Sequence, residues 1–427
     1  MSGEEMTSTS SAGGPSARAF SYRDYRFFWV ATALASFAAQ IMAIALGLDV
    51  YLLTHDAFYL GLIGLSLFSP ALLLVLVTGL VVDRFNRRVI MMICGGVELI
   101  CALVLLAFNV SGLTNVVPVF VLLICLGTSR AFLSPATSSL APNLVPRQAL
   151  ASAISLNASA WQTANILGPV VGGVLASISL QLAFATAALF SALAVGSVFF
   201  IHAPAQRVYS QATSVATLLA GVRYIWHEKV VLGAISLDLF AVLLGGATAL
   251  MPVFALDVLH VGATGLGFMR AAPGIGAIPT ALYLARSPIK DRAGHILFVF
   301  VALFGLFTLV FGLSQWIWLS IPMLMLMGAC DMVSVSIRET LMQLWTPDEV
   351  RGRVNAVNSV FIGASNELGE FRAGTMARII GGLVGSSPYG AVIAVAAGGA
   401  ATMVVSGVWS LMFPKLRQAR RLDRREA

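Results

Sequence analysis

Charged residues are scarce in this chain. Asp, Glu, Lys and Arg make up 11% of its 427 residues, against about 25% in an ordinary soluble protein, whereas 58% of the residues are apolar. A water-soluble globular protein of this length would need more charged surface, so the composition excludes that class. The apolar residues run continuously rather than alternating, which excludes a transmembrane barrel and predicts helices that cross a lipid bilayer.

Cysteine, histidine and catalytic motifs are also sparse. The four cysteines all fall inside apolar runs without a C-x-x-C spacing, and the five histidines lie near predicted membrane surfaces. We expect these residues to serve packing and the membrane interface, with no metal site and no cofactor. Neither H-E-x-x-H nor G-x-S-x-G nor a Walker loop occurs, so an integral-membrane enzyme, like a non-transporting receptor, is only a lesser alternative.

The apolar runs predict an all-α integral membrane protein. A helix needs about 20 mostly apolar residues to cross the hydrocarbon region. Twelve transmembrane helices are predicted, at residues 27–53, 57–82, 89–110, 115–138, 150–177, 181–202, 230–256, 263–286, 294–313, 316–340, 353–383 and 388–413.

Lys and Arg flank these spans on one side only. With the N-terminus in the cytoplasm, the outer loops contain neither Lys nor Arg, whereas Arg84, Arg147 and the tail from Lys415 to Arg425 lie inside. The positive-inside rule therefore predicts that both termini are cytoplasmic. The net charge of +7 follows from this asymmetry and from attraction to anionic lipid, so nucleic acid is not an expected partner.

The two halves of the chain repeat with a constant offset of 201 residues, as from Gly127 to Gly328. Across two spans and their connecting loop, further identities in this register are Pro146 with Pro347, Asn157 with Asn358, Asn165 with Asn366, Gly168 with Gly369 and Gly173 with Gly374. Six spans in each half give both halves the same orientation, so the repeat predicts two parallel bundles related by an axis along the membrane normal.

The predicted organisation has five parts. They are a Ser/Gly/Thr-rich disordered tail without a cleaved signal at 1–19, a six-helix half at 20–202, an amphipathic cytoplasmic linker at 203–228, a second six-helix half at 229–414 and a basic cytoplasmic tail at 415–427. The alternative for the end of the linker is that it begins the seventh span.

A dense group of charges follows the second predicted span. Its fixed positions have the pattern G-x-x-x-D-R-x-x-R-R, formed by Gly79, Asp83, Arg84, Arg87 and Arg88. The pattern resembles the signature loop between the second and third helices of the major facilitator superfamily. The resemblance implies a transporter whose two six-helix halves rock to open a central cavity to each side of the membrane in turn.

In that family the loop aspartate closes a cytoplasmic gate against the opposite half. The sequence TPDE at 346–349 is typical of a helix start in which Thr346 is the N-cap and Glu349 completes a capping box. Arg351 and Arg353 follow as cationic partners. The resemblance therefore implies a latch between Asp83 and this helix start.

A second motif points to antiporters within the superfamily. Gly168, Pro169, Gly172 and Gly173 resemble the core of the fifth-helix antiporter motif, although Ala164 stands where the family has a glycine. Small residues let neighbouring helices approach closely, and a proline bends the helix that carries it. The alternative is ordinary tight packing.

The fourth span keeps the family pattern only in part. Gly127 and Pro135 are in place, but Leu123 stands at the usual arginine position and Arg130 lies about two turns nearer the cytoplasm. Further stretches, including 346–354 and 358–371, resemble the bacterial branch that contains enterobactin exporters and macrolide pumps. That resemblance implies a location in the bacterial inner (cytoplasmic) membrane.

Ionisable residues inside the spans are expected to mark the transport route, because a charge near a helix centre costs about 2 kcal/mol or more. The candidates for proton coupling are Glu370, Glu367, Asp238 and Glu98, in that order. The remaining candidate cavity charges are Asp49, Arg130, Arg270, Asp331 and Arg372. Structural ion pairing is an alternative for each of them, and Asp49 lies close enough to the outer surface to reach water.

The repeat relates several of these charges. Arg130 superposes on Asp331, which predicts that the two meet across the cavity. Glu367 and Glu370 are three residues apart and share a helix face. Two neighbouring carboxylates in a low dielectric do not both ionise easily, so we expect one of them to carry a proton. The alternative is a salt bridge to Arg372 or Arg270, which would leave the coupling elsewhere.

Together these features predict a proton-coupled antiporter that exports an amphipathic small molecule such as a drug or a siderophore. The proton gradient replaces a cofactor as the energy source, the cargo and the bilayer are the expected partners, and the monomer is the expected functional unit. A translocator of lysophospholipid or another lipid is the alternative within transport, because an apolar cavity serves both cargoes.

Overall fold

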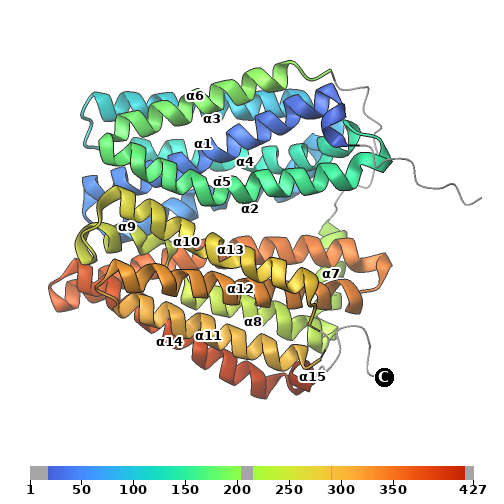
Figure 1. Ribbon diagram of the computed structural model, residues 1–427, viewed down its shortest axis with the longest axis vertical. Coiled ribbons are helices and arrows are strands. Elements are labelled where there is room, and N and C mark those ends of the chain that lie inside the picture. Colours follow the sequence, from blue (N-terminus) through green and yellow to red (C-terminus); the bar gives the residue numbers. More distant parts are fainter. Residues whose placement is uncertain (1–17, 203–214, 290, 419–427) are drawn as a thin grey trace, which may run out of the picture.

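The computed structural model describes residues 18–202, 215–289 and 291–418, and these residues form helices and loops without strands. They build two bundles that lie side by side (Figure 1). The first bundle contains η1 (Ala19–Ser21), α1 (Arg23–Thr54), α2 (Ala57–Arg84), α3 (Arg87–Val110), α4 (Val117–Leu140), η2 (Ala141–Asn143), η3 (Arg147–Ala149), α5 (Leu150–Ile178) and α6 (Leu180–Phe199). The predicted tails at 1–17 and 419–427 lie outside the described residues.

The second bundle repeats this plan with one interruption. It contains α7 (Val215–His227), α8 (Lys229–Gly245), η4 (Thr248–Leu250), α9 (Met251–Val253), η5 (Phe254–Val258), α10 (Gly262–Arg286), α11 (Ala293–Leu313), α12 (Ile317–Trp345), α13 (Asp348–Val384), α14 (Ser387–Met412) and α15 (Pro414–Gln418). The predicted all-α membrane fold is confirmed.

Nine helical segments of the described chain are long and apolar enough to cross a membrane. The other three long helices, α5, α10 and α13, have 29, 25 and 37 residues, so they are equally able to span it by length. All three contact the other bundle, since α5 and α10 pack against each other and α13 packs against α2. The count is consistent with the twelve predicted spans.

The predicted span 230–256 is wrong as a single helix. Helix α8 ends at Gly245, and the chain continues through Gly246 into the short turns η4 and α9 and the π-helical turn η5. Two consecutive glycines weaken the helix here. The carbonyl groups freed by the break are satisfied by Arg372, which donates to Leu243 and Leu244.

The predicted linker 203–228 lies partly outside the described residues, at 203–214. Its remainder forms α7, which ends at His227 before α8 begins, so α7 is a separate helix and not the start of the seventh span. Helix α7 packs on the second bundle, where Tyr224 Oη donates to the carbonyl of Trp345 at 2.7 Å.

Two glycine-rich contacts join the bundles. A Cβ on Gly374 of α13 would lie 3.0 Å from the nitrogen of Gly61 in α2, and a Cβ on Gly173 of α5 would lie 2.9 Å from Cα of Gly267 in α10. Backbones can approach this closely only when side chains are absent. The pairs α2–α13 and α5–α10 therefore form the interface between the halves.

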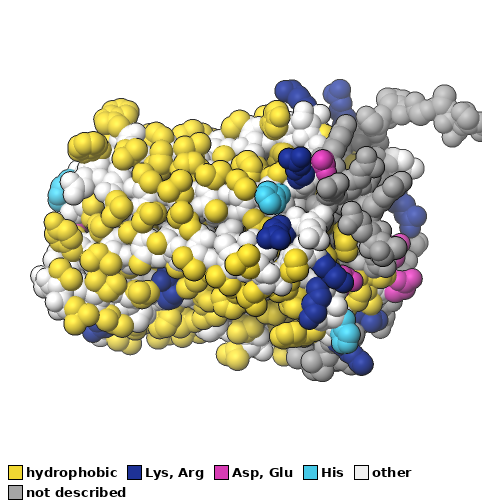
Figure 2. Space-filling view, turned by 90° about the horizontal axis from the view of Figure 1, so that it is seen from below, with side chains coloured by type: hydrophobic (Ala, Val, Ile, Leu, Met, Phe, Trp, Pro, Cys, Tyr) yellow, Lys and Arg dark blue, Asp and Glu magenta, His cyan; other side chains and the backbone are white. Residues whose placement is uncertain are grey.

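The charges separate the two ends of the molecule. One end, called here the arginine-rich end, carries Arg84, Arg87, Arg88, Arg147 and Arg292, whereas the loops at the opposite end contain neither Lys nor Arg. Figure 2 shows most Lys and Arg side chains of one face gathered at a single end and hydrophobic side chains over the remainder. This is the distribution from which the positive-inside prediction was made.

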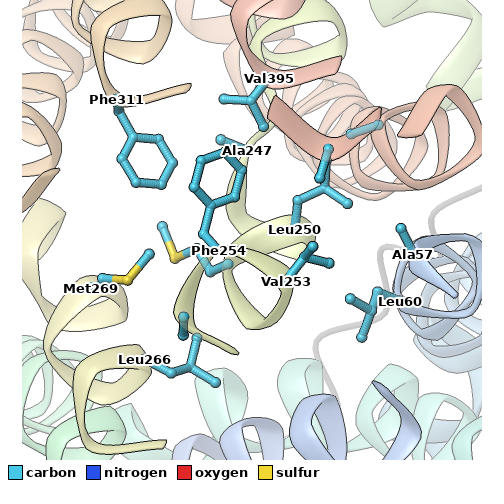
Figure 3. Close-up of a cluster of buried hydrophobic side chains, with 14 of the residues drawn as sticks. Ala57, Leu60, Ala247, Leu250, Val253, Phe254, Leu266, Met269, Phe311 and Val395 are labelled. Carbon is cyan, nitrogen blue, oxygen red and sulfur yellow. The ribbon is translucent and has the colours of Figure 1, made fainter. Parts of the chain in front are cut away.

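At the opposite end the two halves are closed against each other. A hydrophobic cluster there joins Ala57 and Leu60 of α2 to Leu250, Val253 and Phe254 of the interrupted segment (Figure 3). The ring of Phe254 stacks on Phe311 with 4.8 Å between centroids.

Polar contacts between the halves lie at the same end. Arg378 Nε is 3.3 Å from Asp56 Oδ2, and Tyr51 donates to Asp257. This ion pair and this hydrogen bond both bridge the halves. The molecule is therefore held closed at the opposite end.

Candidate functional site

Two carboxylates of α13 converge on a glycine of the other half. A Cβ on Gly64 of α2 would lie 3.2 Å from Glu370 Oε2 and would clash with Glu367 Oε2. Both acids therefore occupy the space that a side chain at residue 64 would fill, so they lie at the boundary between the halves. This places together the two residues that sequence reasoning put on one helix face.

Two arginines face this carboxylate pair. Glu367, Glu370, Arg130 of α4 and Arg270 of α10 line one cavity of about 320 Å³, together with Gln40 of α1. The Nε atom of Arg270 is buried and makes no hydrogen bond among the described residues. No described ion pair within 4 Å ties Arg270 to either acid. The charges are thus near one another without being locked together.

Arg372 does not join this group. Its Nε donates to the carbonyl of Leu243 at 2.8 Å and its Nη2 to that of Leu244 at 2.5 Å, and Nη1 lies 3.0 Å from Met376 Sδ. The guanidinium thus caps the last turn of α8, which favours a positive charge. The expected role of Arg372 as a cavity charge, and its alternative as a partner of the acids, are both wrong.

A larger cavity leads away from the carboxylates. It has a volume of about 600 Å³ and runs between α2, α4 and α13, from Arg130 and Glu367 at one end to Thr78 and Gly79 at the other. Gly79 belongs to the predicted gate motif at the arginine-rich end. Because Arg130 and Glu367 line both cavities, the carboxylate site is connected toward that end.

Arg130 pairs within its own half. Its Nε lies 3.7 Å from Oε1 of Glu98, and both residues line a cavity of about 400 Å³ inside the first bundle. Asp331 instead lines a separate cavity of the second bundle. The expected Arg130–Asp331 pair is wrong for this conformation, because the repeat relates depth in the membrane but not the direction in which a side chain points.

The second bundle has its own buried ion pair. Arg338 of α12 contacts Asp238 of α8, and both line a cavity of about 120 Å³ with Asp331, Glu339 and Asn366. Sequence reasoning missed Arg338, although an arginine inside the predicted span 316–340 was a sufficient signal. Asp238 is therefore engaged in a direct pair, which leaves Asp331 and Glu339 as the acids of this cavity without a described ion pair.

Asp49 is separated from these groups. It is buried on α1, where Nδ2 of Asn109 donates to Oδ1 at 2.9 Å, and it does not line the 320, 400 or 600 Å³ cavities. The alternative that it simply reaches water is wrong, since only 8% of the residue is exposed.

Two arginines of the gate motif, Arg87 and Arg88, hydrogen-bond to neighbouring helices. Arg87 donates to the carbonyl of Ser139 at 3.0 Å, and Arg88 donates to those of Val198 and Phe199 at 3.2 and 2.5 Å. They bind the carboxyl ends of α4 and α6, where the helix dipole favours cations. Arg84 is exposed, and the side chain of Asp83 lies outside the described part of the chain.

The predicted capping box at 346–349 is wrong. Helix α13 begins at Asp348 with Pro347 in the N-cap position, and the hydroxyl of Thr346 is buried without a hydrogen-bond partner. Arg351 folds back instead, with Nη2 at 2.6 Å from Asp348 Oδ1 and 3.1 Å from the carbonyl of Thr346. Glu349 and Arg353 lie on the same first turns of α13.

The antiporter-like motif lies at two helix contacts. A Cβ on Gly168 would be 2.6 Å from Cβ of Gln40, and one on Gly172 would be 3.0 Å from Cα of Ile41, both in α1. Gly173 and the carbonyl of Pro169 face α10 across the boundary between the halves. The motif therefore packs α5 against both α1 and α10. Helix α5 continues through Pro169 without interruption.

Comparison with known proteins identifies the family. A family model described as transmembrane secretion effector matches residues 16–423. The enterobactin exporters EntS of Shigella boydii and of Escherichia coli O1:K1 are each 23% identical over 348 residues, which span 78% of this chain and 80% of theirs.

Solved transporter structures share the fold. A bacterial homologue of the human lysosomal transporter Spinster, in an inward-facing and unoccupied conformation, matches with a TM-score of 0.71 and 13% identity over 94% of this chain and 99% of its own. A D-xylose–proton symporter matches with a TM-score of 0.68 and 13% identity over 92% of this chain and 99% of its own. The chain belongs to the transmembrane secretion effector family of the major facilitator superfamily, and it is a multi-pass membrane transporter rather than an enzyme.

Proposed function

We propose that this transporter is a proton-coupled antiporter that exports an amphipathic small molecule such as a drug or a siderophore. The observation that carries the proposal is the meeting of Glu367 and Glu370 at Gly64, on the boundary between the two halves. Acids at this boundary can exchange protons with either side as the halves rock. The enterobactin exporters among its relatives support the outward direction and a siderophore-like cargo.

The chemistry of the pair suits proton transfer. Two carboxylates that share a small space within the membrane repel each other when both are ionised, so one of them holds a proton. Arg130 and Arg270 line the same cavity and favour release of that proton when they approach. Protons would enter from the outer side and leave through the 600 Å³ cavity, which also has room for the cargo.

The orientation in the membrane follows from the charge distribution. We assign the arginine-rich end and both termini to the cytoplasm of a bacterial inner membrane. The present conformation, closed at the opposite end, is then the inward-facing state that receives cargo from the cytoplasm. The monomer contains the complete cavity, so it is the proposed functional unit.

Asp83 is the proposed latch of the outward-facing state. Its position at the end of α2 allows it to approach the start of α13 when the arginine-rich end closes. We expect Asp83→Asn to lower transport at normal expression and to increase labelling of a single cysteine placed at Ser359, in the 600 Å³ cavity. Unchanged transport and labelling would remove Asp83 from the gate.

The function can be tested in everted membrane vesicles that contain the protein and are acidified inside by respiration. Addition of an exported compound should release part of the pH gradient, which acridine orange fluorescence reports. The panel should include cationic drugs, macrolides, iron-free siderophores and a lysophospholipid, because the last tests the lipid alternative. Antiport would be contradicted if a compound accumulates to the same level with and without the pH gradient and its addition moves no protons.

A further inference from the structure

The cavity of about 400 Å³ inside the first bundle has no role in the proton pathway described above. It is lined by α1, α3, α4 and α6 and by Trp161 of α5, with Glu98 and Arg130 in its wall. Its volume falls in the range of about 300–1,000 Å³ that is usual for small-molecule sites. A charged cavity of this size has room for a ligand that suits its chemistry.

Four hydroxyl groups of its wall are available to a ligand only as hydrogen-bond acceptors. Thr32, Ser36, Thr137 and Ser138 line the cavity, and each donates its O–H to the carbonyl four residues earlier in its own helix. Their donors are therefore already used, and only oxygen lone pairs remain for a ligand. A ligand that carries N–H donors satisfies these four groups, whereas an anion does not.

Glu98 and Trp161 also favour a cation. Glu98 is buried, and its described partner is Arg130 at 3.7 Å, which is longer than a hydrogen bond and leaves acceptor sites on the carboxylate open. Trp161 is exposed in the same wall. An indole ring attracts a cation placed over its face.

We propose that this cavity binds the ammonium head of a cationic amphipathic cargo, with Glu98 as its counter-charge and Trp161 and the four hydroxyls as neutral partners. The inference rests on the proposed function and names its cargo class. The apolar body of the cargo lies toward the 600 Å³ cavity, where Leu67, Phe68 and Leu72 of α2 form an apolar wall.

Arg130 connects this site to the proton pathway. It lines all three cavities, and the charged groups that share them with it are Glu98 of α3, Glu367 and Glu370 of α13, and Arg270 of α10. An ammonium group on Glu98 displaces Arg130, which moves to Glu367. A positive charge beside that carboxylate favours its ionised form, so cargo binding expels a proton. This is the sign that antiport requires.

Calorimetry on the purified full-length protein tests the site with three probes that share one aromatic body. They are 2-(1-naphthyl)ethylammonium, 2-(1-naphthyl)ethanol and 1-naphthylacetate. The ammonium probe should bind at least about tenfold more tightly than the other two, because a charge-assisted hydrogen bond is worth more than 1.4 kcal/mol. Titrations in buffers of different ionisation enthalpy should show proton release on binding.

Variants separate the roles of the residues. Glu98→Gln should abolish the preference for the ammonium probe, and Trp161→Leu should weaken its binding about fivefold. Arg130→Met should bind the ammonium probe without releasing a proton. Asp49→Asn is the matched control, since it neutralises a buried carboxylate of the same half outside the cavity, and it should leave binding unchanged.

Equal binding of the three probes by the wild type, or an intact preference in Glu98→Gln, would overturn the proposed site. The proposed function fails in a different way. If the ammonium probe binds through Glu98 but its transport ignores an imposed pH gradient, antiport is contradicted and the site stands. If gradient-driven transport of the ammonium probe persists in Glu98→Gln, antiport stands and the site is contradicted.

Discussion

Each half contains an ion pair between its own helices, and the two pairs differ in how tightly the structure holds them. Asp238 and Arg338 are in direct contact, and 11% of each side chain is exposed. Glu98 and Arg130 are separated by 3.7 Å, and 39% of the Arg130 side chain is exposed. The same pairing chemistry thus gives a fixed contact in the second half and an exchangeable one in the first.

The surroundings explain the difference. The Asp238–Arg338 pair lies in a cavity of about 120 Å³, which has little room for a cargo, whereas Arg130 borders cavities of about 320, 400 and 600 Å³. A charge with several partners within reach changes partner at small cost, and a charge with one partner does not. We therefore assign a stabilising role to the Asp238–Arg338 pair and a coupling role to the Glu98–Arg130 pair.

The largest effect is expected from breaking the fixed pair. Arg338→Met leaves Asp238 buried without its partner, which should lower the free energy of unfolding by about 3–5 kcal/mol. Thermal unfolding of the purified protein in detergent measures this. The double variant Asp238→Leu/Arg338→Met removes both charges and should recover most of the loss. A single variant as stable as the wild type would show that the pair is not a structural contact.

The next-largest effect is expected at Gly64, where the absence of a side chain leaves space for the carboxylates of Glu367 and Glu370. Gly64→Ala places a Cβ where Glu367 Oε2 lies, so the pair is displaced, and gradient-driven transport should fall by about tenfold, equivalent to about 1.4 kcal/mol. Gly96→Ala is the control, because no atom lies within 4 Å of the added Cβ. Initial rates in energised vesicles measure both. Equal rates in the two variants would mean that the position of the carboxylates does not limit transport.

A smaller effect is expected from breaking the exchangeable pair. Glu98→Gln leaves Arg130 with water and other carboxylates within reach, so stability should change by no more than about 1 kcal/mol. The same unfolding measurement as for Arg338→Met provides a direct comparison. A loss as large as that of Arg338→Met would abolish the distinction between the two pairs.

The smallest effect is expected at the contact that closes the opposite end. Asp56→Asn keeps the N-cap of α2, in which the side chain accepts from the nitrogen of Phe58, but removes the charge that faces Arg378. Because this pair is partly exposed, its loss should shift the balance between the two conformations by less than about 1 kcal/mol. Labelling of a cysteine at Ala247, in the closing cluster, reports the shift. A decrease in labelling would contradict the assignment.

Much of the fold and part of the site could be predicted from the sequence. Continuous apolar runs determine membrane helices, and the spacing of Glu367 and Glu370 determines that they share a face, because both depend on local geometry alone. The interruption after Gly245 escaped prediction, since two glycines inside an apolar run do not change its hydropathy. Arg372 stabilises this interruption through a contact between α13 and α8, which cannot be predicted from a local sequence pattern.

The partners of the charged residues inside the spans could not be predicted from the sequence either. The repeat placed Arg130 and Asp331 at equal depth, but the choice of Glu98 over Asp331 depends on which neighbour faces the arginine within its own bundle. Arg338 could have been found from its position inside an apolar span, whereas its contact with Asp238 required the packing of α12 on α8.

The most direct test of proton coupling is proton flux in proteoliposomes that contain the wild type or the Glu367→Gln/Glu370→Gln variant, with an entrapped pH-sensitive dye and an outward gradient of the transported cargo. The wild type should move protons against the direction of the cargo. The double variant should bind the cargo and exchange it downhill without moving protons. Cargo-dependent proton flux in the double variant equal to that of the wild type would contradict the assignment of coupling to this carboxylate pair.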